Sequence, residues 1–178
     1  MRFICKRYAR TSFETEDIFQ DAFIKIFTQI EKFNGSGSFD GWIRRIFINS
    51  AIDYYKNNKK LNEQISFNVS DDFQLGSIEE EEESFISEIA AKLNEEELLE
   101  LINSLPDGYR LVFNLFAIES YSHLQIAEAL NISVGTSKSQ LSKARQMLKK
   151  NILQQLTKHK KTIELKLNPG VLKIEVSA

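Results

Sequence analysis

Residues that break regular structure are scarce in this sequence, which contains 2 prolines and 7 glycines among 178 residues. A many-stranded sandwich or barrel needs such residues at most of its turns, so their scarcity argues against those folds. Apolar residues, including 13 phenylalanines, recur at helical spacing in several segments. The sequence therefore predicts an all-α fold, which we divide below into two small helical domains.

Cysteine is nearly absent, and so are apolar runs long enough to span a bilayer. Cys5 has no second cysteine to pair with, and His123 and His159 are the only histidines that could join it in a metal site. No apolar run approaches the roughly 20 residues of a transmembrane helix, and charges interrupt the first residues too soon for a signal peptide. We expect a cytoplasmic protein with no metal, no cofactor and no membrane insertion.

Motifs for catalysis are also missing. Carboxylates are numerous, but many lie in a charged run at residues 79–83, whereas acid-base catalysis needs carboxylates in a partly desolvated cleft. The Gly-Ser-Gly run at residues 35–37 follows a predicted helix, whereas a dinucleotide-binding loop follows a strand. No nucleophile-elbow pattern is present. The sequence predicts that the chain is not an enzyme.

The formal net charge of -2 hides a strong segregation of charge. Residues 1–62 carry 11 basic and 7 acidic side chains, residues 63–100 carry 1 and 13, and residues 101–178 carry 11 and 5. Two basic segments thus flank an acidic one. Basic segments can neutralise phosphates and release counterions, which supplies the sequence-independent part of nucleic-acid affinity.

The first basic segment predicts two helices separated by a glycine-rich loop at residues 34–38. Ile18, Ala22 and Ile26 lie on one stripe of the first helix, whose opening turn we place at residues 15–17, where acidic groups complement the helix dipole. The second helix runs from about residue 39 to Tyr55. It carries Trp42, Ile46, Asn49 and Asp53 on one face.

The remaining chain begins with an acidic stretch and then returns to helical periodicity. Residues 62–84 predict an acidic linker, because like charges repel and little apolar area is present. Helical spacing resumes at Phe85, and Pro106 marks a new helix start. After residue 162 the pattern fits either a small hairpin around Pro169 or a loose extension.

A helix-turn-helix is predicted between residues 122 and 149. Ser122 and Gln125 form a capping-box pattern before a short helix, residues 131–133 form a turn, and a longer basic helix follows from Val134. Leu141, Ala144 and Leu148 lie on its inward face. Its other side offers hydroxyl, amide and cationic groups for phosphates and base edges, although a merely solvated basic helix is an alternative. These candidates are Thr136, Lys138, Ser139, Gln140, Ser142, Lys143 and Arg145.

Aromatic and basic residues alternate between Phe33 and Lys60, which is typical of single-stranded nucleic-acid binding by base stacking and backbone neutralisation. Trp42 and Phe47 could equally be ordinary core residues, since an aromatic stripe on a helix usually faces inward. The residues alone leave both interpretations open.

These motifs together resemble a known family. The run Asp-Ile-Phe-Gln-Asp-Ala-Phe at residues 17–23, followed by residues 42–49 and Asp53, is similar to conserved region two of extracytoplasmic-function sigma factors of bacterial RNA polymerase. Residues 105–106, Arg110 and Phe113, followed by residues 121–145, are similar to region four. Gln140 stands where the family commonly has arginine, and six residues precede Arg7, where the family usually has a full helix.

The resemblance implies a role for each set of residues. The helix-turn-helix candidates given above would read the minus-thirty-five element of a promoter. Docking on core RNA polymerase would use Asp17, Gln20, Asp21 and Phe23. Binding of the melted minus-ten element and its flanking DNA would use Phe33, Asn34, Ser38, Phe39, Trp42, Arg44, Arg45, Asn49 and Lys56.

The resemblance also implies a domain organisation and partners. Region two would occupy residues 1–61, the acidic linker residues 62–84, and the region-four helix-turn-helix domain residues 85–155, leaving a tail at residues 156–178 without an assigned role. The implied partners are core RNA polymerase, promoter DNA and an anti-sigma factor. One alternative is a free-standing helix-turn-helix transcriptional regulator in which the first 60 residues serve dimerisation. A helical interaction protein without DNA binding would leave the basic segments unexplained.

Overall fold

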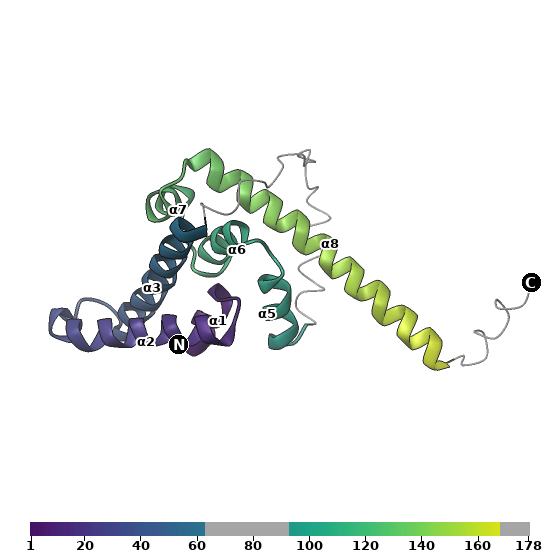
Figure 1. Cartoon of the computed structure of the whole chain (residues 1–178), viewed down its shortest axis with the longest axis horizontal. Coiled ribbons are helices and arrows are strands. Elements are labelled where there is room, and N and C mark those ends of the chain that lie inside the picture. Colours follow the sequence, from purple (N-terminus) through teal and green to yellow (C-terminus); the bar gives the residue numbers. More distant parts are fainter. Residues whose placement is uncertain (63–92, 168–178) are drawn as a thin grey trace, which may run out of the picture.

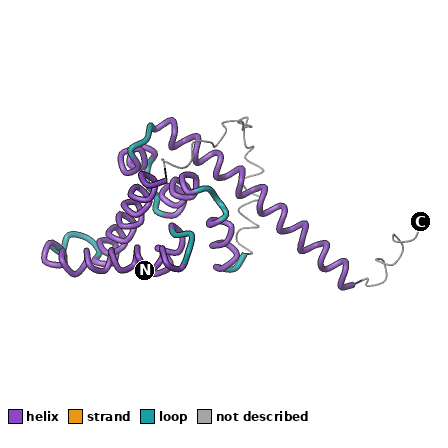
Figure 2. The backbone as a smooth tube through the Cα atoms, viewed as in Figure 1, coloured by secondary structure: helices purple, strands orange, loops and turns teal. Residues whose placement is uncertain are grey.

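The computed structural model describes residues 1–62 and 93–167 of the chain. Every regular element in these two ranges is helical (Figure 2), which confirms the predicted all-α fold. We call residues 1–62 the first lobe and residues 93–167 the second lobe. Apart from residue 62, the predicted acidic linker lies outside the described residues, and the domain boundaries remain a prediction.

The first lobe contains three α-helices and a short 3-10 turn among its described residues. They are α1 (Arg2–Tyr8), α2 (Ser12–Gln29), η1 (Ile30–Lys32) and α3 (Phe39–Asn62). Helix α2 begins about one turn earlier than predicted, because the Thr11 hydroxyl caps it by accepting from the backbone N–H of Glu14 at 3.1 Å. Thr15, predicted in the opening turn, is the fourth residue of α2 and is buried.

The second lobe contains the predicted helix-turn-helix. Its elements are α5 (Glu95–Asn103), α6 (Asp107–Phe113), the π-helical η2 (Asn114–Ile118), α7 (His123–Leu130) and α8 (Val134–Leu167). The capping box is confirmed, since the Ser122 hydroxyl accepts from Gln125 N–H at 3.2 Å and the Gln125 amide oxygen accepts from Ser122 N–H at 2.8 Å. Pro106 marks the start of α6, as predicted, and lies at its N-cap, one position before the first helical turn.

Helix α8 is longer than the sequence pattern indicated. The predicted basic helix ended near residue 149, but α8 continues to Leu167, so the described part of the expected hairpin or extension is helical. The last part of α8 projects away from the other helices (Figure 1). No helix within the described ranges has both the length and the apolar character needed to cross a bilayer.

Buried apolar side chains from both lobes form one continuous cluster. Ile18, Phe47 and Ile52 of the first lobe belong to it together with Val112 and Leu115 of the second. The lobes therefore bury apolar area against each other, at roughly 1.5–3 kcal/mol for each fully buried large side chain. A smaller cluster lies where α5 packs on α8. It comprises Leu101, Leu105, Ala144, Leu148 and Ile152.

The last turn of α1 is capped by side chains of the second lobe. A helix leaves its final backbone carbonyls without partners inside the helix, so they need donors from elsewhere. Three donors come from α5, α6 and η2. Asn103 Nδ2 donates to the carbonyl of Lys6 at 3.3 Å, Asn114 Nδ2 to that of Arg7 at 2.8 Å, and Arg110 Nη2 to that of Tyr8 at 2.9 Å.

Replacing Ser122 by alanine removes one half of the capping box and leaves the Gln125 N–H without its acceptor. Loss of a serine N-cap costs about 1 kcal/mol, so Ser122→Ala should lower the free energy of unfolding by about that amount in urea titrations followed by circular dichroism. Ser36→Ala, an exposed loop serine outside any cap, should change it by less than about 0.5 kcal/mol. Equal values for the two variants would contradict the assigned cap.

Candidate nucleic-acid interface

Three aromatic rings gather at the amino-terminal end of α3. The ring centroids of Phe33 and Phe39 are 5.2 Å apart, those of Phe33 and Trp42 are 5.6 Å apart, and those of Phe39 and Trp42 are 5.8 Å apart with nearly parallel planes. Phe39 is 42% exposed, and the other two rings are partly buried. A partly exposed aromatic cluster of this kind offers faces on which unpaired bases can stack.

The loop beside this cluster has open space above its backbone. Gly35 and Gly37 adopt φ values of 74° and 87°, which glycine tolerates best, and no heavy atom lies within 4 Å of a Cβ added at either. Asn34 Oδ1 accepts from the N–H of Ser36 at 3.0 Å, and the Ser38 carbonyl accepts from the N–H of Trp42 at 3.0 Å. Asn34 thus bonds within the loop, and Ser38 precedes the first turn of α3.

Helix α3 separates the two interpretations that the sequence left open. Phe47 is 2% exposed and packs on Phe19 with centroids 5.5 Å apart, so it is a core residue. Trp42 instead remains partly exposed in the aromatic cluster. Arg45 and Asn49 are exposed on the same helix and accessible to a ligand.

The outward side of α2 combines carboxylates with exposed aromatic rings. Gln20 and Asp21 are exposed and Asp17 is partly exposed. Phe23 is 53% and Phe27 is 76% exposed, with ring centroids 6.3 Å apart. Large apolar side chains that remain exposed together commonly mark a protein-binding surface.

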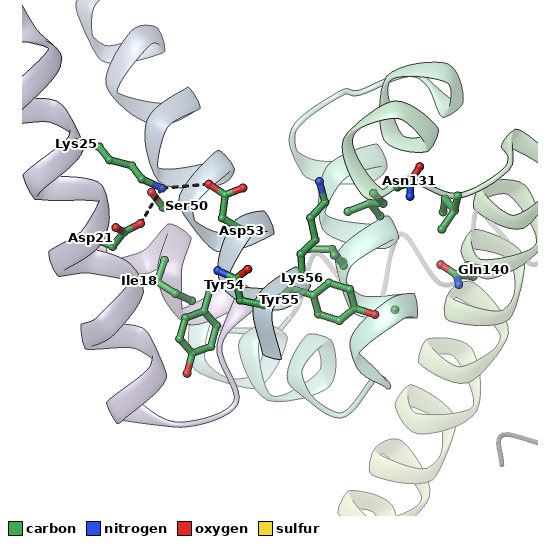
Figure 3. A pocket seen from close by; sticks show the side chains of 15 residues that line it. Ile18, Asp21, Lys25, Ser50, Asp53, Tyr54, Tyr55, Lys56, Asn131 and Gln140 are labelled. Atoms are coloured by element: carbon green, nitrogen blue, oxygen red, sulfur yellow. Dashed lines mark hydrogen bonds and ion pairs between the residues drawn. The ribbon is translucent and has the colours of Figure 1, made fainter. Parts of the chain in front are cut away.

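An ion-paired lysine links α2 to α3. Lys25 Nζ lies 2.8 Å from Asp21 Oδ2 and 3.1 Å from Asp53 Oδ2 (Figure 3). The bonds to both carboxylates favour the protonated amine and together raise the pKa of Lys25 against the opposing effect of burial. Asp21 of α2 and Asp53 of α3 therefore share the Lys25 amine as their ion-pair partner, although they are far apart in the sequence.

The helix-turn-helix has the expected turn and inward face. Asn131 ends α7 in the left-handed region with φ of 55°, which asparagine tolerates better than most residues. The Ser133 hydroxyl then accepts from the N–H of Thr136 at 2.9 Å at the start of α8. Leu141 and Ala144 are buried as predicted, so the opposite side of α8 faces away from the core.

The predicted reading residues divide into groups with different surroundings. Lys138 and Arg145 are exposed, and Ser142 and Lys143 are partly buried. The hydroxyls of Thr136 and Ser139 already make local bonds, to Ser133 Oγ and to the Thr136 carbonyl respectively. These hydroxyls therefore help to fix the first turns of α8.

His123, for which the sequence pattern indicated no role, packs between η2 and α8. The ring of His123 stacks on Phe116 with centroids 4.6 Å apart, and its Nδ1 lies 2.9 Å from the hydroxyl of the fully buried Ser137. Arg145 lies over the Phe116 ring, 6.0 Å from its centroid. Burial, with Lys138 and Arg145 nearby, lowers the pKa of His123 and favours the neutral ring.

A cavity of about 840 Å³ lies between the lobes (Figure 3). Lys56 and Tyr55 line it from α3, and Gln140 lines it from α8. A Cβ added at Gly108 would lie 3.5 Å from Gln140 Nε2 and 3.6 Å from the Tyr55 hydroxyl. Lys56 and Gln140 therefore lie at the seam between the lobes, apart from the aromatic cluster at the other end of α3.

Arg44 also faces the second lobe. Its Nε donates to Oε2 of Glu119 at 2.7 Å, and this hydrogen bond raises the pKa of Arg44. Arg44 and Glu119 are 75 positions apart in the sequence, which explains why no periodicity or motif pointed to Glu119.

Burial dominates the electrostatics of the core beneath the seam. It lowers the pKa of Arg110, against the opposing effect of Asp107, and it raises the pKa of the Tyr8 hydroxyl. Burial also raises the pKa of Cys5 to about 11, so this thiol is protonated at neutral pH. Cys5 is a structural residue in the core.

The chain matches family models and characterised proteins over most of its length. The Sigma-70 region 2 model matches residues 1–61, and the Sigma-70, region 4 model matches residues 95–148. The ECF RNA polymerase sigma factor SigW of Bacillus subtilis is 33% identical over 160 residues, which cover 84% of this chain and 81% of SigW. The ECF RNA polymerase sigma-E factor of Haemophilus influenzae is 28% identical over 138 residues, covering 76% and 73% of the two chains.

Among solved structures, the sigma factor RpoE in complex with the anti-sigma factor NepR from Bartonella quintana has a similar fold. The two chains superpose with a TM-score of 0.51 and 19% identity, over 86% of this chain and 89% of the other. At this identity the likeness concerns the fold alone.

Proposed function

This chain belongs to the sigma-70 family as a sigma factor of the extracytoplasmic-function type, and we propose that its two lobes recognise the two elements of a promoter separately. As a member of this family it binds core RNA polymerase and directs promoter-specific transcription initiation. In this proposal the chain has no catalytic activity of its own and acts through the polymerase. The residue assignments below are part of the proposal.

The aromatic cluster at the start of α3 is the observation that carries the minus-ten assignment. A base read on its pairing edge must first leave the helical stack, and it then needs an aromatic or apolar surface in place of its neighbours. Phe33, Phe39 and Trp42 offer such a surface beside a loop with open space above its backbone. Asn49 can donate to and accept from one base edge. Arg44, Arg45 and Lys56 supply cations for the backbone.

The outward side of α2 is the proposed polymerase-binding surface. Asp17, Gln20, Asp21 and Phe23 were assigned to it from the family resemblance, and Phe27 extends it by one helical turn. Phe27 is the most exposed of the phenylalanines on this helix. Its position one turn after Phe23, with the two rings in contact, makes a single apolar patch flanked by polar groups.

The second lobe is proposed to bind the minus-thirty-five element as duplex DNA. Lys138 and Arg145 are exposed on α8, and Lys143 lies between them along the helix. Cations spaced in this way can contact phosphates while Gln140 and Ser142 meet base edges. Because Gln140 replaces the arginine common at this position, we propose that base contacts there depend on an amide.

We also propose an anti-sigma factor as a partner, in keeping with the structurally similar RpoE, which was solved in complex with NepR.

The domains proposed for residues 1–61 and 85–155, with the linker at 62–84, keep the boundaries predicted from the sequence. A free-standing regulator would use the helix-turn-helix alone and would not need the aromatic cluster or the exposed face of α2. Binding to core polymerase separates the two proposals.

The polymerase surface can be tested with Phe27→Ser. Burying this ring in an interface should contribute about 1.5–3 kcal/mol, so the variant should bind immobilised bacterial core RNA polymerase at least tenfold more weakly than the parent chain. Leu124→Ser, which alters a leucine that is 61% exposed on the second lobe, is the matched control and should bind normally. Failure of the parent chain to bind core polymerase would support the free-standing regulator.

Asn49→Ala should impair promoter melting and leave binding to duplex DNA unchanged. An amide paired with a base edge contributes about 1–3 kcal/mol of discrimination, so open-complex formation should fall about tenfold or more. Asn57→Ala, an exposed asparagine two turns further along α3, is the control. On a template already unpaired across the minus-ten element, the Asn49 variant should lose base preference. If it keeps the preference of the parent, Asn49 is structural.

Lys143→Ala should weaken binding to minus-thirty-five duplex and reduce its dependence on salt. A lysine that neutralises one phosphate releases about one counterion, so the slope of log affinity against log salt should fall by about one unit. Lys150→Ala, two turns beyond on the same side of α8, should leave the slope unchanged. Fluorescence anisotropy between about 50 and 200 mM salt measures both slopes. An unchanged slope for Lys143→Ala removes this residue from the interface.

A further inference from the structure

Glu119 of the second lobe accepts hydrogen bonds from two arginines of the first lobe. Its Oε1 lies 2.6 Å from Nη2 of Arg7, and its Oε2 lies 2.7 Å from Nε of Arg44. The side chains of Glu119 and Arg7 are 2% and 7% exposed, whereas that of Arg44 is 45% exposed. The carboxylate thus holds one arginine inside the seam and one that solvent can still reach.

The backbone before and after Glu119 is unusual. Helix α6 runs into the π-helical η2, and Ser120 has φ of 59°, a left-handed conformation that is costly for serine. The turn is closed by Glu119 N–H donating to the Asn114 carbonyl at 3.0 Å and by Tyr121 N–H donating to the Leu115 carbonyl at 2.9 Å. π-Helical turns and strained residues concentrate at functional sites. The turn from Asn114 to Ser120 places the Glu119 carboxylate against the first lobe.

The ion pairs of Glu119 suit a contact that can open. The cost of removing a carboxylate and a guanidinium from water offsets much of their mutual attraction, so the intact pair can open at modest cost. Loss of the carboxylate alone would leave the buried Arg7 without its partner, which favours separation of the lobes. Separation of the lobes returns both charges to water and recovers their hydration. A second ion pair across the seam, Arg10 with Asp107 at 2.7 Å, is largely exposed and contributes little.

The described arrangement of the lobes is too closed for both promoter elements. By their names the two elements lie about 25 base pairs apart, which is on the order of 85 Å of straight duplex at 3.4 Å per base pair. In contrast, Glu119 and Arg44 are 2.7 Å apart, and the proposed reading residue Gln140 lines a cavity together with Lys56 of the first lobe. The lobes must therefore separate before each can reach its element.

We propose that Glu119 is a latch that keeps the lobes closed in the free chain and competes with nucleic-acid phosphate for Arg44. This inference rests on the proposed function, which assigns Arg44 to promoter DNA. In the closed chain Glu119 occupies the Nε donor of Arg44. When the lobes separate, Arg44 exchanges this carboxylate for a phosphate, and Glu119 and Arg7 become hydrated.

The test compares full-length chains without polymerase, with a fluorescent single-stranded oligonucleotide of mixed sequence as the probe. If only about a tenth of the parent chain is open, release of the latch should tighten binding about tenfold. Glu119→Gln should show this gain and a larger radius of gyration in small-angle X-ray scattering. Glu128→Gln removes a negative charge from an exposed position of the same lobe and should change neither value.

Glu119→Asp provides a second variant that keeps a negative charge beside the buried Arg7. Its shorter side chain cannot reach both arginines in the same arrangement, so it should also bind the oligonucleotide more tightly. The parent chain should expand when the oligonucleotide saturates it. This last measurement needs no variant and remains informative if either substitution prevents folding.

Two results would overturn the latch. One is equal affinity and equal radius of gyration for the parent and a folded Glu119 variant, and the other is a parent chain that does not expand on binding. Transcription by core polymerase with the parent chain is measured in parallel. If either result is found while promoter-specific transcription is normal, only the latch proposal is wrong. If promoter-specific transcription is absent, the proposed function is wrong.

Discussion

The carbonyls at the end of α1 need hydrogen-bond donors, and the second lobe supplies them. Asn103, Arg110 and Asn114 donate to three successive carbonyls, so the end of a seven-residue helix is satisfied by side chains about 100 residues away in the sequence. A helix this short is not stable by itself in water. Its buried face and these three bonds make α1 the junction on which the relative placement of the lobes depends.

Because this junction holds the lobes together, some candidate residues are exposed to solvent and others are occupied by contacts with the other lobe. The aromatic cluster lies at the end of α3 away from the seam, and Asn49 is exposed on the same helix. The apolar patch of α2 is also exposed to solvent. Arg44, Lys56 and Gln140 face the seam, where they contact the other lobe or line the cavity. In the closed chain the proposed polymerase surface on α2 is therefore exposed, while part of the proposed nucleic-acid surface is occupied.

Local features were predictable because neighbouring residues determine them. The Ser122 capping box, the glycine-rich loop at residues 34–38 between two helices, and the buried face of α8 each depend on spacings of a few residues, and the structure has all of them. The predicted start of α2 was about one turn too late. Acidic residues at positions 16 and 17 indicated the opening turn, but the Thr11 hydroxyl caps the helix and Glu14 is the acidic residue of its first turn.

Tertiary features were not predictable in the same way. Phe47 and Trp42 lie on one helix and have similar character, and only the packing of α2 against α3 makes the first a core residue and leaves the second in the exposed cluster. The Arg7 and Glu119 pair joins residues 112 positions apart, which no periodicity reports. The strained turn at Ser120 could not be predicted either, because serine rarely adopts a left-handed backbone conformation and its presence does not indicate one.

Transcription from a library of random DNA sequences, with bacterial core polymerase and this chain, tests most directly whether the two lobes recognise two separate promoter elements. The account predicts that the chain produces transcripts absent with core polymerase alone. Sequences upstream of their start sites should share two conserved blocks, near positions minus ten and minus thirty-five. Transcripts that share a single block, or no transcripts beyond those of core polymerase, would contradict it.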